Sequence, residues 1–460
     1  MSDPLNSSEF LSLLSAAQQQ LDEGFAYLPE SASAPLPPEA AAVLAEAATR
    51  MFDNYPYAHP LYAGQMLKPP HPVARAAYAM AMSVNPNNHA LDGGRASSAM
   101  ELEAVAELAA MFGLPQQHLG HLTSSGTIAN LEALWVAGLV KPGKAVAASA
   151  QAHYTHTRIS AVLGLPFFAI PVDDTNRVDL NALEHLLQTE QIGTVVATLG
   201  TTATGSVDPL DEILILQQKY GFRMHVDGAY GGYFTLAGNL EAPARRAYDA
   251  IPQADSVVVD PHKHGLQPYG CGCVLFRDPA VGRFYKHDSP FTYFTSGALH
   301  LGEISLECSR AGASAVALWT TQRLLPLIPG GAFAQGLSQG REAALALYGR
   351  IAESPHFIAP TYPPQLDIVF WAAAAPTPSA SSVLAQAIFD EAAKIGLHLA
   401  LARLSIQLFP EGTWVANPLY VLEPTVLCLR SVLMKPEHLP WIERIWALLE
   451  AATGAAQSPA

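Results

Sequence analysis

A lysine and an aspartate each follow an apolar segment of this chain. Lys263 comes after the β-branched run 256–259 and Asp260-Pro261-His262, and Asp227 ends the run 222–226. An amine that emerges from a buried strand into a cleft is partly desolvated, so it loses its proton more easily and can form a Schiff base with an aldehyde. A carboxylate nearby can pair with a pyridinium nitrogen. Pyridoxal phosphate (PLP) needs these two groups from a protein.

Two turns between expected strands and helices offer further polar groups. Gly200-Thr201-Thr202 follows the apolar run 195–199, and Ser125-Gly126-Thr127 precedes a helix expected to run through Leu134. Free N–H groups and hydroxyls at a helix start bind phosphate well. Each motif alone is weak, because such turns often serve only as helix caps or turn formers. Ligands in open α/β sheets bind beyond the carboxyl ends of the strands, so the coincidence of these motifs at one sheet edge is informative.

The elements that position these groups alternate between apolar strands and helices. This alternation predicts an α/β fold in which a mainly parallel sheet is covered on both faces. We expect an amino-terminal arm with a helical segment over residues 1–90, with an extended stretch at 53–90. A large domain over 91–335 and a smaller α/β domain over 336–460 follow. Ser98 to Glu101 reads as a capping box at the start of a helix.

Composition narrows the classes of protein that fit. The chain has 460 residues, of which 50% are hydrophobic and 14% charged, so it is expected to fold with a large core. A formal charge of −15 argues against broad contact with nucleic acid or anionic membranes. Four cysteines are too few for a disulfide framework, and Cys271-Gly-Cys273 reads as buried strand thiols rather than as a metal or redox pair. A cytoplasmic protein without membrane spans is expected.

The chain resembles the group II PLP-dependent decarboxylases, which include the aromatic amino acid, glutamate and tyrosine decarboxylases and have the fold type I, aspartate aminotransferase-like architecture. The resemblance runs from about His59 to Pro436. The motifs that carry it are Thr123-Ser-Ser-Gly-Thr-Ile-Ala-Asn130, His153, Thr198-Leu-Gly-Thr-Thr202, His225-Val-Asp-Gly-Ala229, Asp260-Pro-His-Lys263, Glu307-Cys-Ser-Arg310 with Leu318-Trp319, and Leu429-Arg430 through Pro436.

The resemblance implies a role for each matching residue of the cofactor site. Lys263 would hold PLP as an internal aldimine, and Asp227 would keep the pyridinium nitrogen protonated. His153 would stack on one face of the ring, with Ala229 on the other. Thr202 would bond near Asp227 and the ring oxygen. The phosphate would be held by Ser125, Gly126 and Thr127, with help from His262.

The resemblance also suggests residues that handle the substrate. Arg430 lies in an otherwise apolar strand and is expected to clamp the substrate α-carboxylate, with a structural ion pair as the alternative. Tyr293 is the candidate general acid, and His59 and Tyr62 belong to an arm that helps to line the pocket; ordinary packing or surface roles remain open for all three. Arg310 could support either the structure or the active site.

The implied reaction is decarboxylation of an L-amino acid to an amine and CO2 through a quinonoid intermediate. Transamination, carbon–carbon lyase chemistry on the same scaffold and a catalytically silent relative are alternatives. A metal site at His225, His262 and His264 is a further one, for which no closed ligand set is apparent. His264 departs from the tryptophan of the aromatic decarboxylases, and Ile128 from a common glutamate, so the substrate side chain stays open. An acidic substrate would need a second cation, such as Lys68, Arg75 or Arg95. The resemblance also implies a homodimer with shared active sites.

Overall fold

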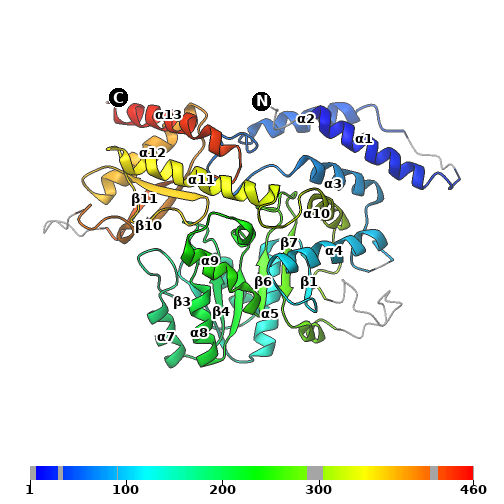
Figure 1. Ribbon diagram of the computed structural model, residues 1–460. Coiled ribbons are helices and arrows are strands. Elements are labelled where there is room, and N and C mark those ends of the chain that lie inside the picture. Colours follow the sequence, from blue (N-terminus) through cyan, green and yellow to red (C-terminus); the bar gives the residue numbers. More distant parts are fainter. Residues whose placement is uncertain (1–6, 30–34, 91, 287–303, 415–422, 459–460) are drawn as a thin grey trace.

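A seven-stranded sheet forms the centre of the computed structural model, which describes residues 7–29, 35–90, 92–286, 304–414 and 423–458 (Figure 1). Its strand order is β1-β7-β6-β5-β4-β2-β3. The strands are β1 (Leu119–Thr123), β2 (Ala145–Ser149), β3 (Phe167–Ile170), β4 (Ile192–Thr198), β5 (Arg223–Asp227), β6 (Ser256–Val259) and β7 (Gly272–Phe276). Neighbours from β3 to β6 run parallel, whereas β7 is antiparallel to both β6 and β1. The predicted mainly parallel sheet is confirmed.

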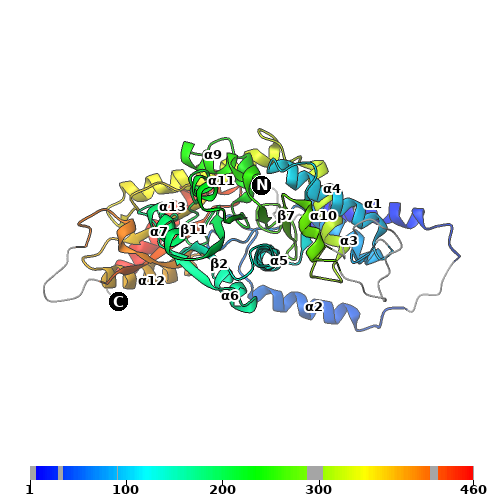
Figure 2. The same ribbon diagram turned by 90° about the horizontal axis from the view of Figure 1, so that it is seen from below.

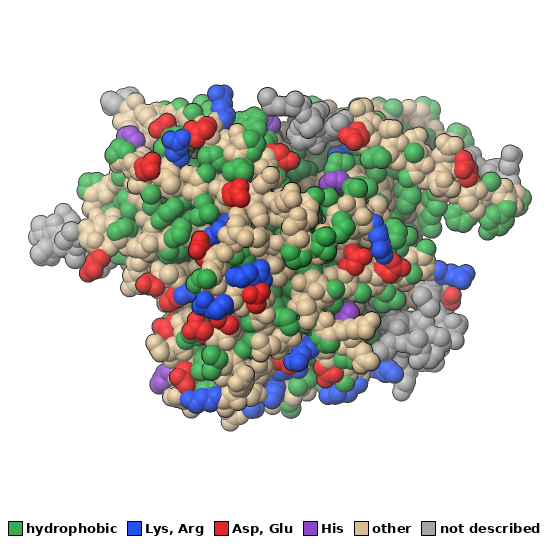
Figure 3. Space-filling model, in the orientation of Figure 1, with side chains coloured by type: hydrophobic (Ala, Val, Ile, Leu, Met, Phe, Trp, Pro, Cys, Tyr) green, Lys and Arg blue, Asp and Glu red, His purple; other side chains and the backbone are tan. Residues whose placement is uncertain are grey.

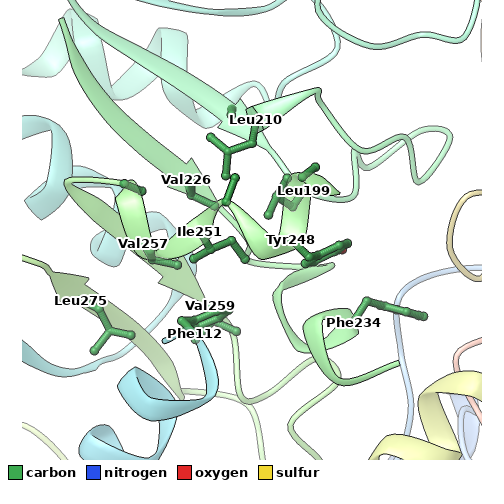
Figure 4. Packing of buried hydrophobic residues seen from close by; sticks show 14 of the residues in the cluster. Phe112, Leu199, Leu210, Val226, Phe234, Tyr248, Ile251, Val257, Val259 and Leu275 are labelled. Atoms are coloured by element: carbon green, nitrogen blue, oxygen red, sulfur yellow. The ribbon is translucent and has the colours of Figure 1, made fainter. Parts of the chain in front are cut away.

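Helices cover both faces of this sheet, because successive strand residues point to opposite sides. In β6, Val257 and Val259 join one buried cluster and Val258 joins another. The first cluster includes residues of α4 (Arg95–Met111), α7 (Leu180–Thr189), α8 (Leu210–Tyr220), α9 (Ala242–Asp249) and α10 (Gly312–Leu324). Figure 4 shows Phe112, which follows α4, beside Val259 in this cluster. The opposite face is covered by α5 (Gly126–Val140) and α6 (Thr155–Val162).

A second, antiparallel sheet organises the smaller domain, which lies above the large sheet in Figure 1. Its order is β10-β11-β9-β8, from β8 (Phe357–Ile358), β9 (Ile368–Ala373), β10 (Ala400–Ser405) and β11 (Thr425–Val432). The helices α12 (Pro378–Lys394) and α13 (His438–Gln457) pack with this sheet and with each other.

One long helix joins the two cores. In α11 (Ala332–Glu353), Phe333 and Leu337 pack into the core of the large sheet, whereas Leu347 and Ile351 pack into the core of the small sheet. The domain boundary predicted at 335–336 falls within this helix and stays a prediction. Continuous helix across that point couples the positions of the two domains.

The amino-terminal part corrects two expectations. It contains α1 (Ser7–Gly24), α2 (Ala40–Arg50) and α3 (Pro72–Val84), so the expected extended 53–90 stretch is wrong over residues 72–84. Pro72 occupies the first helical position and the His71 ring accepts the Val73 N–H, which starts α3. The predicted capping box is also wrong, because α4 begins at Arg95 and Ser98 and Glu101 are buried within the helix.

The surface differs between the amino-terminal helices and the body. No residue of α2 is buried against the described chain, and α2 projects along the edge of the molecule (Figure 2). Acidic and basic side chains are interspersed over the face shown in Figure 3. Among the described residues, no helix is both long and apolar enough to cross a membrane.

Candidate functional site

A cavity of about 210 Å³ lies at the carboxyl ends of β4, β5 and β6 and at the start of α5. These three strands are parallel neighbours, so the groups that follow them meet at one edge of the sheet. All nine residues assigned to the cofactor from the sequence line this cavity: Ser125, Gly126, Thr127, His153, Thr202, Asp227, Ala229, His262 and Lys263. It is also lined by Asn130, Thr155, Thr198, Gly200, Tyr230 and Asp260, to which the sequence assigned no role.

Asp227 is a buried carboxylate whose two oxygens both accept hydrogen bonds. Its Oδ2 lies 2.8 Å from Nε2 of His156, and its Oδ1 lies 3.1 Å from the backbone nitrogen of Ala229. Burial alone raises the pKa of Asp227, but the His156 hydrogen bond and the Ala229 N–H outweigh it and hold the pKa below its usual range. The group is therefore an anion inside the protein, which suits a cationic ring nitrogen.

His156 is the residue of this site that sequence reasoning missed. It lies in α6, three positions after His153, and its side chain is fully buried. The His153 ring lines the cavity, and its Nδ1 is 2.9 Å from Oγ1 of Thr155. Burial lowers the pKa of His153, so its ring is neutral near pH 7. The sequence carried no local signal for His156, because its contact with Asp227 joins residues 71 positions apart.

Lys263 points its amine at a second buried carboxylate. Its Nζ lies 3.1 Å from Oδ2 of Asp260, while Oδ1 of Asp260 has no hydrogen-bond partner among the described residues. The same carboxylate presses against Gly126, where an added Cβ would lie 2.5 Å from both oxygens. Glycine is therefore required at the start of α5 because of this close approach.

A chain of hydrogen bonds fixes the start of α5 to the sheet. Oγ of Ser125 caps the helix by accepting the Ile128 N–H at 3.3 Å. Asn130 contacts Nε2 of His225 at 2.8 Å, and Nδ1 of His225 contacts Oγ of Ser256 at 2.9 Å. Burial lowers the pKa of His225 to about 3, so this ring is neutral and serves as a spacer between β5 and α5.

These residues fit PLP. The cavity brings together an amine, an ionised carboxylate and the free N–H groups of a helix start, which match the aldehyde, ring nitrogen and phosphate of that cofactor. The buried Oδ1 of Asp260 and Oγ1 of Thr198 have no partner in the described part of the chain, so the wall retains unused polar atoms. Near this wall, His262 is bonded through Nδ1 to the Cys271 carbonyl at 2.7 Å.

Arg430 lies behind the turn that follows β4, and it is outside the cavity lining. Its guanidinium donates to the carbonyls of Thr202 at 2.6 Å and Ala203 at 2.9 Å. Its Nη1 makes only long contacts, 3.4 Å to the Gly64 carbonyl and 3.5 Å to Oε1 of Gln65. Arg430 thus ties β11 to the turn that carries Thr202 and to the amino-terminal arm.

The remaining predicted residues are not brought to the cavity wall. Nδ1 of His59 accepts the Leu61 N–H, and its ring packs against Trp441 of α13. The Tyr62 ring is buried beneath Lys435 and packs against Tyr57. Tyr293 lies outside the described residues.

Arg310 has a structural position. Its Nη1 lies 2.7 Å from Oε1 of Glu101 and also contacts the carbonyl of Leu122, at the end of β1. The backbone N–H of Leu122 donates to the same Glu101 carboxylate. This buried pair supports the strand that leads into the Ser125-Gly126-Thr127 turn, so Arg310 acts behind the cavity rather than inside it.

Comparison with known proteins agrees with this geometry. Residues 71–373 match the pyridoxal-dependent decarboxylase conserved domain. An L-tyrosine decarboxylase from Enterococcus faecium is 29% identical, with 67% of this chain and 68% of the relative covered. An aspartate 1-decarboxylase from Aliivibrio fischeri is 35% identical over 42% of this chain, and the match spans 40% of that relative.

The fold is also that of a solved structure, the Oryza sativa TDC crystallised with PLP and tryptamine. Its TM-score is 0.78 at 18% identity, and both chains are fully covered. At this identity the likeness concerns the fold, whereas the conserved-domain match covers most of the chain and concerns the family. The chain belongs to the pyridoxal-dependent decarboxylase family, and it is a PLP-dependent carboxy-lyase that acts on an amino acid.

Proposed function

We propose that this protein converts an L-amino acid to the corresponding amine and CO2, with Lys263 holding PLP and Asp227 facing its ring nitrogen. The observation that carries the proposal is the placement of Lys263 and the anionic Asp227 in one cavity at the ends of neighbouring strands. PLP, when bound, supplies the electron sink for the pair left at Cα as CO2 departs. The protein supplies orientation, a fixed anion and a site for the returning proton.

The cavity wall suggests how the cofactor would be held. Ser125, Gly126 and Thr127 at the start of α5 would take the phosphate, with His262 beside it. His153 would cover one face of the ring and Ala229 the other, and Thr202 would bond at the ring edge. The neutral state of His153 supports a stacking role, because a flat uncharged ring packs on an aromatic face without a desolvation cost for charge.

Recognition of the substrate carboxylate is proposed for Arg430. Two of its donors are held by backbone carbonyls near 3 Å or less, whereas Nη1 makes only the long contacts to Gly64 and Gln65. Nη1 can therefore donate to a substrate carboxylate at little cost in free energy, because its present hydrogen bonds are long and weak. The arm that carries His59 and Tyr62 would close this side of the pocket.

Proton return is proposed for Tyr293. A phenol is a suitable general acid when held over the reacting carbon. Tyr293→Phe should then slow amine formation while PLP binding is retained. Formation of amine at the wild-type rate by this variant would remove Tyr293 from the role.

The protein is further proposed to act as a homodimer in the cytoplasm. The exposed apolar side chains of the α2 region support this, since 70% of Leu44 and 82% of Phe52 are exposed and a second copy could cover them. All four thiols are free, with Cys271, Cys273 and Cys428 buried and Cys308 exposed, as is usual in a reducing compartment. Light scattering after size exclusion measures the assembly, and a fully active monomer would rule out shared active sites.

Product analysis tests the reaction. Protein reconstituted with PLP is incubated with single L-amino acids, beginning with tyrosine and aspartate, for which the two relatives are named. Amine and CO2 in equal amounts from one class of substrate are expected. A keto acid without CO2 would instead assign transamination, and binding of PLP without any product would assign a silent relative.

A further inference from the structure

A buried polar cluster joins the small domain to the cofactor cavity. Asp367 lies directly before β9 of the small domain and is fully buried. Its Oδ1 accepts a hydrogen bond from the Tyr230 hydroxyl at 2.6 Å, and Tyr230 follows β5 and lines the cavity. Its Oδ2 lies 3.3 Å from Nε2 of His264, the residue after Lys263. One carboxylate of the small domain therefore faces two residues that flank the cofactor site.

The Asp367–His264 contact is close but incomplete. The two atoms lie within reach of each other, yet neither Oδ2 of Asp367 nor either ring nitrogen of His264 has a hydrogen-bond partner in the described structure. Burial holds the pKa of His264 well below its usual value, so the ring is neutral and an ion pair is not formed. Leaving a buried donor and acceptor unpaired is destabilising.

The surroundings of this cluster are well packed, so the unpaired atoms do not reflect a loose region. The His264 ring packs edge-to-face against Tyr230 at 4.8 Å and Phe234 at 5.1 Å. The backbone carbonyl of Asp367 accepts the Leu433 N–H at 2.8 Å, which fixes the residue to the end of β11. The positive charges of Lys68 and Arg430 both act on Asp367, and Lys68 donates to the Met434 carbonyl at 3.3 Å. Asp367 thus links the two domains through one short hydrogen bond to Tyr230 and one incomplete contact with His264.

We propose that Asp367 is a positioning residue that sets the orientation of Tyr230 and, through His264, of Lys263. The proposal rests on Lys263 holding the cofactor, as proposed above. A carboxylate at this position offers the buried imidazole of His264 an acceptor 3.3 Å from its Nε2. Through these contacts the position of the small domain determines the positions of Lys263, which holds the cofactor, and of Tyr230 in the cavity wall.

Asp367→Asn tests this role, because it keeps the shape and removes the charge. The readout is the pH midpoint of the visible absorbance band of PLP bound to the protein, with turnover and urea unfolding measured alongside. A shift of about half a pH unit or more is expected, with kcat lowered about tenfold and KM changed less, because the lysine is misplaced rather than lost. Tyr230→Phe, which removes only the hydroxyl, should shift the midpoint in the same direction.

Ser381→Ala is the matched control. Ser381 is equally buried and donates to the Ala373 carbonyl at the far end of β9, so its loss perturbs the small domain without touching Tyr230 or His264. This variant should lose some stability and keep the wild-type midpoint. A midpoint and kcat of Asp367→Asn equal to those of the wild type would overturn the proposal, as would the same shift in Ser381→Ala. If Asp367→Asn does not fold, an unchanged midpoint in Tyr230→Phe overturns it. Failure of the wild type to bind PLP on Lys263 would instead refute the proposed function.

Discussion

Gly126→Ala should weaken PLP binding, because the start of α5 has no room for a side chain. The added Cβ would lie 2.5 Å from both oxygens and 2.8 Å from Cγ of Asp260. Asp260 cannot move away freely, since it is buried and paired with Lys263 at 3.1 Å. Relieving such an overlap in a packed interior costs about 1–3 kcal/mol. When this strain is present in the PLP-bound protein and relieved in the apoprotein, the Kd for PLP rises about 5- to 150-fold.

The assay is a fluorescence titration of the apoprotein with PLP, with Gly349→Ala as the control. Gly349 also lies in a helix, α11, but an added Cβ there meets no atom within 4 Å. That substitution should leave the Kd unchanged and raise the free energy of unfolding by up to about 1 kcal/mol, because alanine favours helix. A wild-type Kd in Gly126→Ala would refute the packing argument, since it would mean that Asp260 and Lys263 are free to shift.

Three further predictions concern groups behind the cavity. His156→Phe removes the donor to Oδ2 of Asp227 and should raise the Kd for PLP about tenfold in the same titration, as expected for loss of one charged hydrogen bond, whereas His156→Gln should be closer to wild type. Arg310→Ala leaves the buried Glu101 carboxylate unpaired and should lower the free energy of unfolding in urea by about 3–5 kcal/mol. His225 and His438 should make stability depend on pH. Burial lowers both pKa values to about 3, so the unfolded chain binds more protons below pH 6.5 and the folded state loses stability as pH falls from 6.5 towards 3. At pH 5 each would cost about 2 kcal/mol.

Each of these predictions has a result that contradicts it. Equal PLP affinity in His156→Phe and the wild type would show that the contribution of Asp227 to PLP binding does not require the hydrogen bond from His156. Arg310→Lys as stable as Arg310→Ala would show that the pair with Glu101 contributes little. His438→Asn keeps an acceptor for the Lys435 N–H, so it should show a shallower loss of stability between pH 6.5 and 5. If this variant lost as much unfolding free energy between pH 6.5 and 5 as the wild type, His438 would not contribute to the pH dependence.

The sequence predicted the cavity well because its parts are local. Residues at the carboxyl ends of parallel strands lie at one edge of the sheet. The ends of the apolar runs were therefore enough to predict that Thr202, Asp227 and Lys263 lie close together. Ser125 and Gly126 were found for a similar reason, since a helix start is visible in short patterns.

Contacts between distant segments could not be read in this way. The bond between His156 and Asp227 depends on how α6 lies over the sheet, and no spacing along the chain encodes it. Arg430 was correctly placed in an apolar strand, but its backbone partners lie more than 200 positions away. The helix α3 was missed because the Pro- and His-rich sequence before it hid its alanine face, which is buried in the structure.

Reduction of the reconstituted protein with borohydride, followed by peptide mass spectrometry, tests the central claim most directly. Reduction fixes PLP permanently on the lysine that holds it. The account predicts a phosphopyridoxyl group on the peptide that contains Lys263, and its absence from Lys263→Ala. A label on a different lysine, or an equal label in Lys263→Ala, would contradict the assignment of the cavity.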